Sequence, residues 1–201
     1  MKEGWVSPEE RNFMDGSRWD QREFRRITTV HLERTFLSNL DNWTPQFLKI
    51  FLTKGGVAGT KIKHMLDSLS LQQVEGRRDV VIRCLVEFLG ESAEELIKDY
   101  QDVTKDAIEE DIAQHVMKVL VINGGATQED VLIVIEGKEI LHDYESVAKA
   151  YLLLMGFIYA MNFSYPPKLK YTFEVFQKLF LQLDVLKMSP KVTVLHKKLV
   201  V

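Results

Sequence analysis

Residues 150–161 read AYLLLMGFIYAM, the most apolar run in a chain of 201 residues, interrupted only by Gly156. Each helical residue adds about 1.5 Å, so a helix of this length reaches about 18 Å. The hydrocarbon layer of a membrane is about 30 Å thick. Lys149 and Asn162 close the run at its two ends. We therefore expect a helix buried in the core of a protein, and no membrane span.

Three short segments upstream of this run predict a small sheet. β-Branched residues are concentrated at 116–122 and again at 131–135. The sequence Glu-Gly-Lys at 136–138 can turn the chain into a third short strand at 139–141. We expect an antiparallel sheet of two or three strands, which needs a helix against one face to be stable.

Two long helices are expected to cover this sheet, at about 144–162 and at about 166–184. The second has apolar residues at helical spacing and follows Ser164, which is available as an N-terminal cap. Ser189-Pro190 has the form of another helix start, because proline suits the first helical position. A short final helix should follow.

A proline in the first half of the chain predicts a boundary between two helices. A helical period begins at Ile27, and Asp41-Asn42 breaks it. Thr44 can cap the free amides of a new helix, and Pro45 fits its first turn. We expect one helix to end before Thr44 and another to begin there.

The segment that begins at Ser92 has the form of a capping box, Ser-Ala-Glu-Glu. Leu96, Ile97 and Tyr100 follow Ala93 at the spacing of an amphipathic helix. We expect a helix that continues through Tyr100. The acidic stretch 102–111 is expected to form a solvated turn or a short helix.

These elements predict an α+β fold that is predominantly helical, with about seven to eight helices. A chain of this length can bury about 70% of its surface in one core. We expect a single globular domain over residues 27–201 and a peripheral segment over residues 1–26. That segment contains four aromatic residues, which indicates loose docking that becomes ordered near Phe24.

The composition favours a soluble, intracellular domain. Cys84 is the only cysteine, so no intrachain disulfide can form, and a reducing compartment is favoured. The N-terminal residues have neither the apolar core of a signal peptide nor the bias of a transit peptide. We expect a cytoplasmic or nuclear location. The net charge of −3 argues against general binding to polyanions.

The charge is unevenly distributed along the chain. Acidic residues gather at 87–111, and lysines gather at 168–201. The two regions either face each other in the fold or guide a partner. The second region contains a lysine–aromatic set that suits phosphates beside a stacked base, although a solvated lysine face is the plainer interpretation. Its members are Lys168, Lys170, Tyr171, Lys191, Lys197 and Lys198.

No group of residues has the spacing of a catalytic or metal centre. The glycine-rich loop 55–61 lacks the phosphate-binding pattern, because its lysine follows its threonine. His142 could act as a general base, but it is more simply the end of a strand before an Asp143 cap. Cys84 lies in an apolar run, where cysteine packs as a small hydrophobe. We predict no catalytic, cofactor-binding or metal-ligating residue and no cofactor. The five histidines show no metal-ligand pairing: His31, His64, His115, His142 and His196.

Several segments together resemble the C-terminal region of an animal family that is abundant in fish. Its members are labelled similar to sterile alpha motif domain-containing protein 3. The resemblance spans about residues 24–199, and it is most specific at 165–178, YPPKLKYTFEVFQK. The sterile alpha motif itself is absent here. The resemblance implies a module that is appended to interaction domains, and it supplies no catalytic residue. The matching segments are 24–32, 90–92, 135–137, 154–162, 165–178 and 189–192.

Three functional hypotheses follow from the sequence. The first is a non-catalytic protein-interaction or assembly module, which binds a protein partner or a second copy of itself. The second is a nucleic-acid-associated module that uses the C-terminal lysines. The third is an enzyme whose residues meet only in space.

Overall fold

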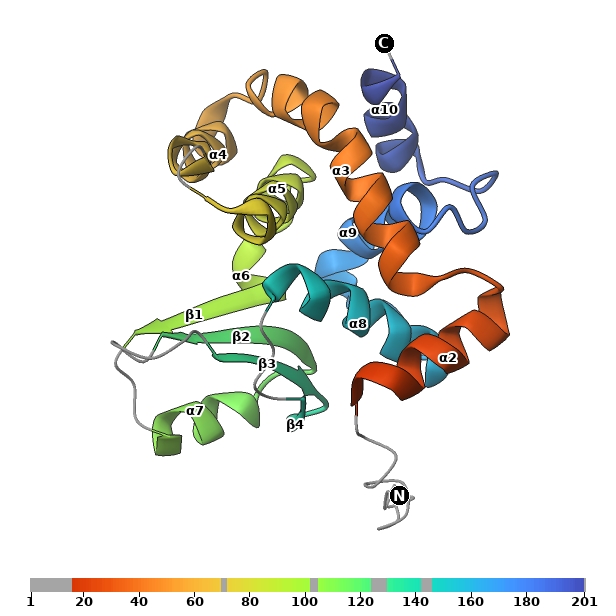
Figure 1. The fold of residues 1–201 in the computed structure, drawn as a ribbon. Helices are drawn as coiled ribbons and strands as arrows, with labels where there is room; N and C mark the ends of the chain where they lie inside the picture. Colours follow the sequence, from red (N-terminus) through yellow and green to blue (C-terminus); the bar gives the residue numbers. More distant parts are fainter. Residues whose placement is uncertain (1–15, 70–71, 102–104, 124–129, 142–145, 201) are drawn as a thin grey trace.

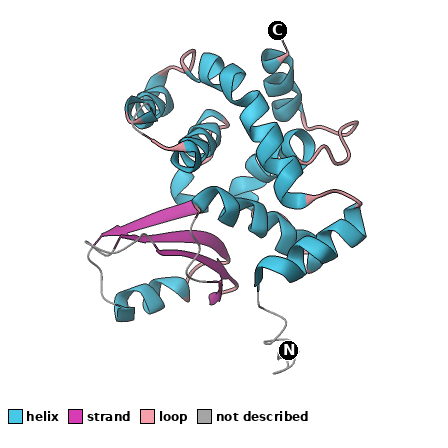
Figure 2. Ribbon diagram, viewed as in Figure 1, coloured by secondary structure: helices cyan, strands magenta, loops and turns pink. Residues whose placement is uncertain are grey.

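A small sheet lies at one side of a larger group of helices, and helix α8 runs between them (Figures 1 and 2). The computed structural model describes residues 16–69, 72–101, 105–123, 130–141 and 146–200. The predominantly helical α+β class is confirmed. In chain order the elements are α2 (Gly16–Thr28), α3 (Leu32–Phe51), α4 (Gly56–Asp67), α5 (Val74–Phe88), α6 (Ala93–Leu96), β1 (Ile97–Gln101), α7 (Lys105–Ile112), β2 (Met117–Asn123), β3 (Asp130–Ile135), β4 (Lys138–Leu141), α8 (Val147–Ala160), the 3₁₀ turn η2 (Pro167–Leu169), α9 (Lys170–Val175), the π-helical turn η3 (Phe176–Phe180) and α10 (Pro190–Leu199).

Helix α8 contains the most apolar run and is buried on all sides. Every residue from 150 to 158 is buried, and the helix packs against α2, α3, α5, β2 and β3. The hydroxyl of Ser146 accepts a hydrogen bond from the Lys149 amide and caps the first turn. The prediction of a core helix is confirmed, with a start at Val147 instead of 144. His142 and Asp143 lie outside the described residues. Within the described ranges, no helix is long and apolar enough to cross a membrane.

The sheet has four strands in the order β1-β2-β3-β4, one more than we expected. The three predicted strands are present and pair antiparallel, while β1 pairs parallel to β2. Val119 is paired with Ile97 on one side and with Ile133 on the other, and all three side chains are buried in the main core. The expectation of a purely antiparallel sheet is therefore wrong at this edge.

The extra strand β1 replaces the helix that we expected through Tyr100. The helix that begins at Ala93 ends at Leu96, after one turn. Residues three apart lie on opposite faces of a strand, so Ile97 and Tyr100 point to opposite sides of the sheet. Ile97 enters the main core and Tyr100 a second, smaller core. Because both faces of the sheet are covered, apolar residues three apart in β1 are both buried. The sequence therefore shows the same spacing of apolar residues as an amphipathic helix.

Helix α7 covers the far face of the sheet and accounts for the acidic stretch. Ile108 and Ile112 of α7 pack against a small apolar layer that includes Leu120 and Leu132. Glu109 and Glu110 remain exposed on the other side. Of the two alternatives for 102–111, a turn or a short helix, the structure has a short helix, and one side of it is buried.

Helix α3 is continuous through Pro45, where a boundary was predicted. Thr44 does not cap a new helix, because its hydroxyl donates to the Leu40 carbonyl within the same helix, at 2.8 Å. Proline inside a helix costs about 3 kcal/mol. Buried side chains on both sides of Pro45, among them Phe36 and Phe47, hold the two halves against one core and offset this cost.

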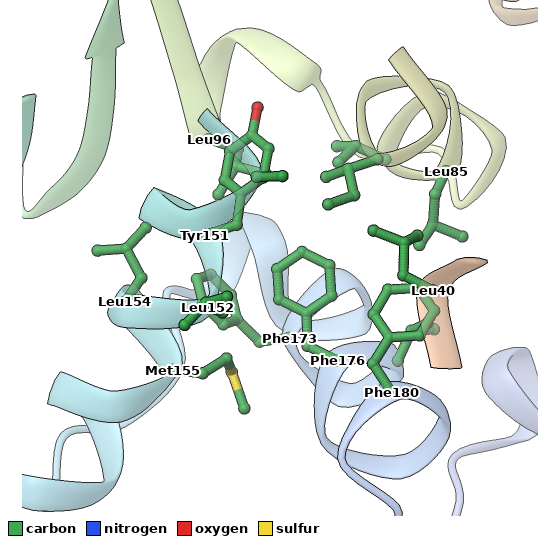
Figure 3. Close-up of a cluster of buried hydrophobic side chains, with 14 of the residues drawn as sticks. Leu40, Leu85, Leu96, Tyr151, Leu152, Leu154, Met155, Phe173, Phe176 and Phe180 are labelled. Carbon is green, nitrogen blue, oxygen red and sulfur yellow. The ribbon is translucent and has the colours of Figure 1, made fainter. Parts of the chain in front are cut away.

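The segment predicted as one helix over 166–184 is divided into η2, α9 and η3. Ser164 is not its N-cap residue, because η2 begins at Pro167 with Pro166 at the N-cap position, and neither Pro166 nor the N-cap residue of α9, Leu169, supplies a side-chain cap. Phe173, Phe176 and Phe180 are fully buried and point toward α8 and Leu40 (Figure 3). The rings of Phe176 and Phe180 stack, with centroids 5.6 Å apart, and both meet Phe36 edge-on.

The two ends of the described chain also pack on this core. Helix α2 runs across the expected boundary at residue 27, and Phe24 is fully buried with its ring edge-on to Tyr159. At the other end the predicted final helix is confirmed as α10. The Ser189 hydroxyl accepts from the Val192 amide, and Pro190 occupies the first turn.

Replacement of Phe176 should test the importance of this aromatic packing. We expect Phe176→Ala to lower the free energy of unfolding by about 3–5 kcal/mol, because a cavity replaces a fully buried ring. Urea denaturation measures the change. Leu186→Ala is the control, since Leu186 is 97% exposed, and it should change stability by about 0.5 kcal/mol or less. Equal losses in both variants would contradict the packing argument.

Candidate functional site

The single thiol lies inside the core. Cys84 is fully buried, and its sulfur lies 3.9 Å from the Ile62 carbonyl oxygen as a weak donor. Burial raises the pKa of the Cys84 thiol to about 12. Because the thiolate is the nucleophile, a protonated and inaccessible thiol has neither the charge nor the access that covalent catalysis requires.

The other groups that we considered as candidates are dispersed. His142 lies outside the described residues, and His31, His64, His115 and His196 belong to different parts of the fold. The glycine-rich loop 55–61 is the start of α4, with Gly56 in the left-handed conformation at φ +68°. Across the described part of the chain, no group of three histidine, cysteine, aspartate or glutamate side chains is placed to hold a metal ion.

Part of the acidic region faces the C-terminal segment. The Glu91 carboxylate accepts from the backbone amides of Tyr171 and Thr172, both at 2.9 Å, and from the Thr172 hydroxyl at 2.7 Å. It thereby caps α9 from a distant part of the sequence. Lys168 pairs with Glu95 at 2.8 Å. By contrast, α7 lies on the far side of the sheet from α10 (Figure 1).

Most of the predicted lysine–aromatic set does come together, beside α10. The Lys191 ammonium lies 4.3 Å from the centroid of the Tyr171 ring and donates to the Leu89 carbonyl at 2.7 Å. Lys170 lies 4.6 Å from the same centroid. Lys198 lies 5.7 Å from the centroid of Phe88. Residues of the predicted set thus lie together beside α10, whereas Lys168 pairs with Glu95 instead.

Three residues beside this cluster, Lys54, Phe88 and Val194, come from outside the predicted set. The Lys54 ammonium lies 5.2 Å from the Phe88 centroid and donates to the Phe88 carbonyl at 2.9 Å. Each of the rings of Phe88 and Tyr171 therefore carries two ammonium groups. We call the whole set the α10 surface: Lys54, Phe88, Lys170, Tyr171, Lys191, Val194, Lys197 and Lys198.

Two grooves run along α10 within this surface. One, of about 420 Å³, lies between α10 and the end of α5, with Phe88, Leu89 and Leu195 among its apolar walls. The other, of about 510 Å³, lies between α10 and the end of α3. Val194 and Lys198 line both grooves, and Val194 is 55% exposed. Among the residues that the structure describes, no acidic side chain lines either groove.

The lysines of this surface carry an uncompensated positive charge. Within the described ranges, Lys54, Lys191, Lys197 and Lys198 form no ion pair with a carboxylate. The rings beside them attract the ammonium groups through their negative faces but carry no net charge. An apolar groove with a cationic rim favours a partner that combines apolar and acidic side chains.

The sequence indicated only part of this surface. The C-terminal lysines are visible as a local excess of positive charge, whereas Lys54 and Phe88 lie far upstream, each close to the glycine that ends its helix. No periodic pattern connects them with α10. They join it only because α3, α5 and α10 pack on the same core.

Neither a protein-family model, nor a curated protein, nor a solved structure matches this chain. The resemblance to the family labelled similar to sterile alpha motif domain-containing protein 3 therefore stays a prediction.

Glu91 should contribute to stability through its cap on α9. We expect Glu91→Gln to lower the free energy of unfolding by about 1–2 kcal/mol, because the amide group cannot reproduce the three charge-assisted bonds. Urea denaturation measures this change. Glu94→Gln removes the same charge from an exposed neighbour and should leave stability almost unchanged. An equal loss in both variants would show that only the net charge matters.

The Cys84 thiol should be inert in the folded protein. We expect Ellman's reagent to react with it only as fast as the core opens, and at once in denaturing urea, because burial keeps it protonated and covered. Leu186→Cys in a Cys84→Ala background provides an exposed thiol as the control. If native Cys84 reacts as fast as that control, the thiol is accessible and the argument fails.

Proposed function

We propose that this protein is a non-catalytic interaction module and that its α10 surface binds an acidic, partly apolar segment of a partner protein. The observation that supports this proposal is the pair of grooves that share Val194 and Lys198, with lysines at the rim and no acidic side chain among the described lining residues. The single cysteine favours an intracellular partner, in the cytoplasm or the nucleus.

The shape of the surface suits an amphipathic helix or a short extended segment. Such segments bind with a few apolar side chains in a groove, and charged neighbours set the orientation. Here Val194 offers an apolar contact between the two grooves. Carboxylates on either side of the partner's apolar residues would meet Lys191 in one groove and Lys197 in the other. The positive surface would also accelerate the encounter.

The lysines equally support the nucleic-acid alternative, but the aromatic rings favour it less. Single-stranded nucleic acids bind by stacking their bases on exposed aromatic faces. The rings of Tyr171 and Phe88 already carry ammonium groups of this protein at 4.3 to 5.7 Å from their centroids. A base would have to displace them. The enzyme hypothesis gains no comparable support from Cys84.

A defined probe can test the proposal. The probe is a fluorescein-labelled amphipathic peptide with leucine on one face and glutamate on the other, and its fluorescence anisotropy reports binding to the full chain. We expect Val194→Asp, and separately Lys197→Glu with Lys198→Glu, to weaken binding about fivefold or more, because apolar contact and ion pairing are lost. Lys63→Glu with Lys138→Glu changes the charge equally at exposed positions elsewhere and should bind like the wild type.

Three outcomes would contradict the proposal. The first is no binding of the peptide at low salt. The second is equal binding of a peptide with the same composition in scrambled order. The third is tighter binding of a single-stranded oligonucleotide than of the peptide, which would favour the nucleic-acid alternative. Thermal unfolding of each variant ensures that a loss of binding does not come from a loss of folding.

A further inference from the structure

A second groove with a strongly positive lining lies between α2 and the start of α3. It encloses about 540 Å³, within the range typical of small-molecule sites. Arg22 and Arg25 line it from α2, and Arg34 lines it from the first turn of α3. All three arginines are exposed residues. This groove is separate from the α10 surface, whose contacts with α3 are at the other end of that helix.

The acidic side chains in this groove are already neutralised. Asp41 is held by Arg78, whose Nη2 lies 2.6 Å and whose Nε lies 2.9 Å from its two oxygens. One oxygen of Glu33 lies 3.3 Å from the Lys149 ammonium, and the other accepts from Gln21 at 3.2 Å. Among the residues that the structure describes, no carboxylate pairs with Arg22, Arg25 or Arg34. Three guanidinium groups therefore remain available to an anion.

The surrounding structure fixes the two helices that carry the arginines. Arg22 and Arg25 are one turn apart, so they lie on the same side of α2. Phe24 on α2 and Leu32 on α3 are both buried in the main core, which fixes the angle between the helices. In the connection, the Thr28 hydroxyl donates to the Phe24 carbonyl and accepts from the Val30 amide. Thr29 adopts the left-handed conformation, with φ +63°.

The chemistry of the lining suits an anion with several oxygen atoms, such as a phosphate ester. Guanidinium groups bind phosphate oxygens through two parallel N–H donors, and arginine stays charged at all physiological pH values. Among the residues whose side chains the structure describes, no phenylalanine, tyrosine or tryptophan lines the groove. His31 and Ser38 add further polar groups to the lining.

We propose that the groove between α2 and α3 binds a small ligand with two or more phosphate groups, held by Arg22, Arg25 and Arg34. Polyol phosphates and inorganic polyphosphates belong to this class. The same chemistry occurs free in solution and on the headgroup of a phosphorylated inositol lipid.

Calorimetry with two soluble probes and a vesicle assay test this proposal on the full chain. The soluble probes are inositol hexakisphosphate and pyrophosphate. The vesicles contain phosphatidylcholine with or without phosphatidylinositol bisphosphate. We expect Arg25→Ala with Arg34→Ala to weaken phosphate binding about tenfold or more, because two charge-assisted contacts are lost. Arg26→Ala with Arg77→Ala removes the same charge outside the groove and should stay within about twofold of the wild type.

The results separate the sources of the ligand and the possible failures. Binding of a soluble probe supports a free ligand, and binding to phosphoinositide vesicles alone supports a lipid headgroup. Absence of binding to both at low salt overturns the proposal, as does an equal loss in the control pair. Binding of the acidic peptide to the α10 surface should be the same in both arginine double variants, so this test is independent of the proposed function.

Discussion

The burial of α8 on all sides between Ala150 and Ile158 is the constraint on which the rest of the structure depends. A helix with apolar residues all round must be covered on every side, which requires the sheet on one side and α2, α3 and α5 on the others. Tyr151 brings a hydroxyl into this interior, and it donates to Asp79 at 2.7 Å. Arg83 then connects Asp79 on α5 with Asp99 on β1. Burial, reinforced by the charge of Asp79, raises the pKa of Tyr151.

This polar connection determines how the two layers of the fold meet. The apolar contacts of α8 are non-directional, whereas the bonds from Tyr151 through Arg83 to Asp99 have fixed geometry. These bonds hold α5 against β1, which is an edge strand of the sheet. The remaining helices then bring the two positively charged surfaces to opposite ends of α3, a helix of 20 residues and about 30 Å in length. A rigid core of this kind allows both surfaces to be preformed.

Much of the fold could be predicted from the sequence wherever one local signal determined the outcome. The apolar run predicted α8, the β-branched segments predicted β2 and β3, and Ser189-Pro190 predicted the start of α10. The errors occurred where tertiary packing overrode a local signal, as at Pro45 in α3 and at Tyr100 in β1. The surfaces follow the same rule. The C-terminal lysines were visible as composition, whereas Lys54, Phe88 and the arginines of the α2–α3 groove meet only through the folded core.

The parallel pairing of β1 with β2 also has a consequence for the order of assembly. Strands β2, β3 and β4 follow one another in sequence and pair with their nearest neighbours, so they can form early at little entropic cost. Helix α7 lies between β1 and β2 in the sequence. Strand β1 can therefore pair with β2 only after the connection through α7 has packed across the face of the sheet. Until then the edge of β2 that β1 later covers stays unpaired, and in a partly folded chain it is open to pairing with a neighbouring molecule.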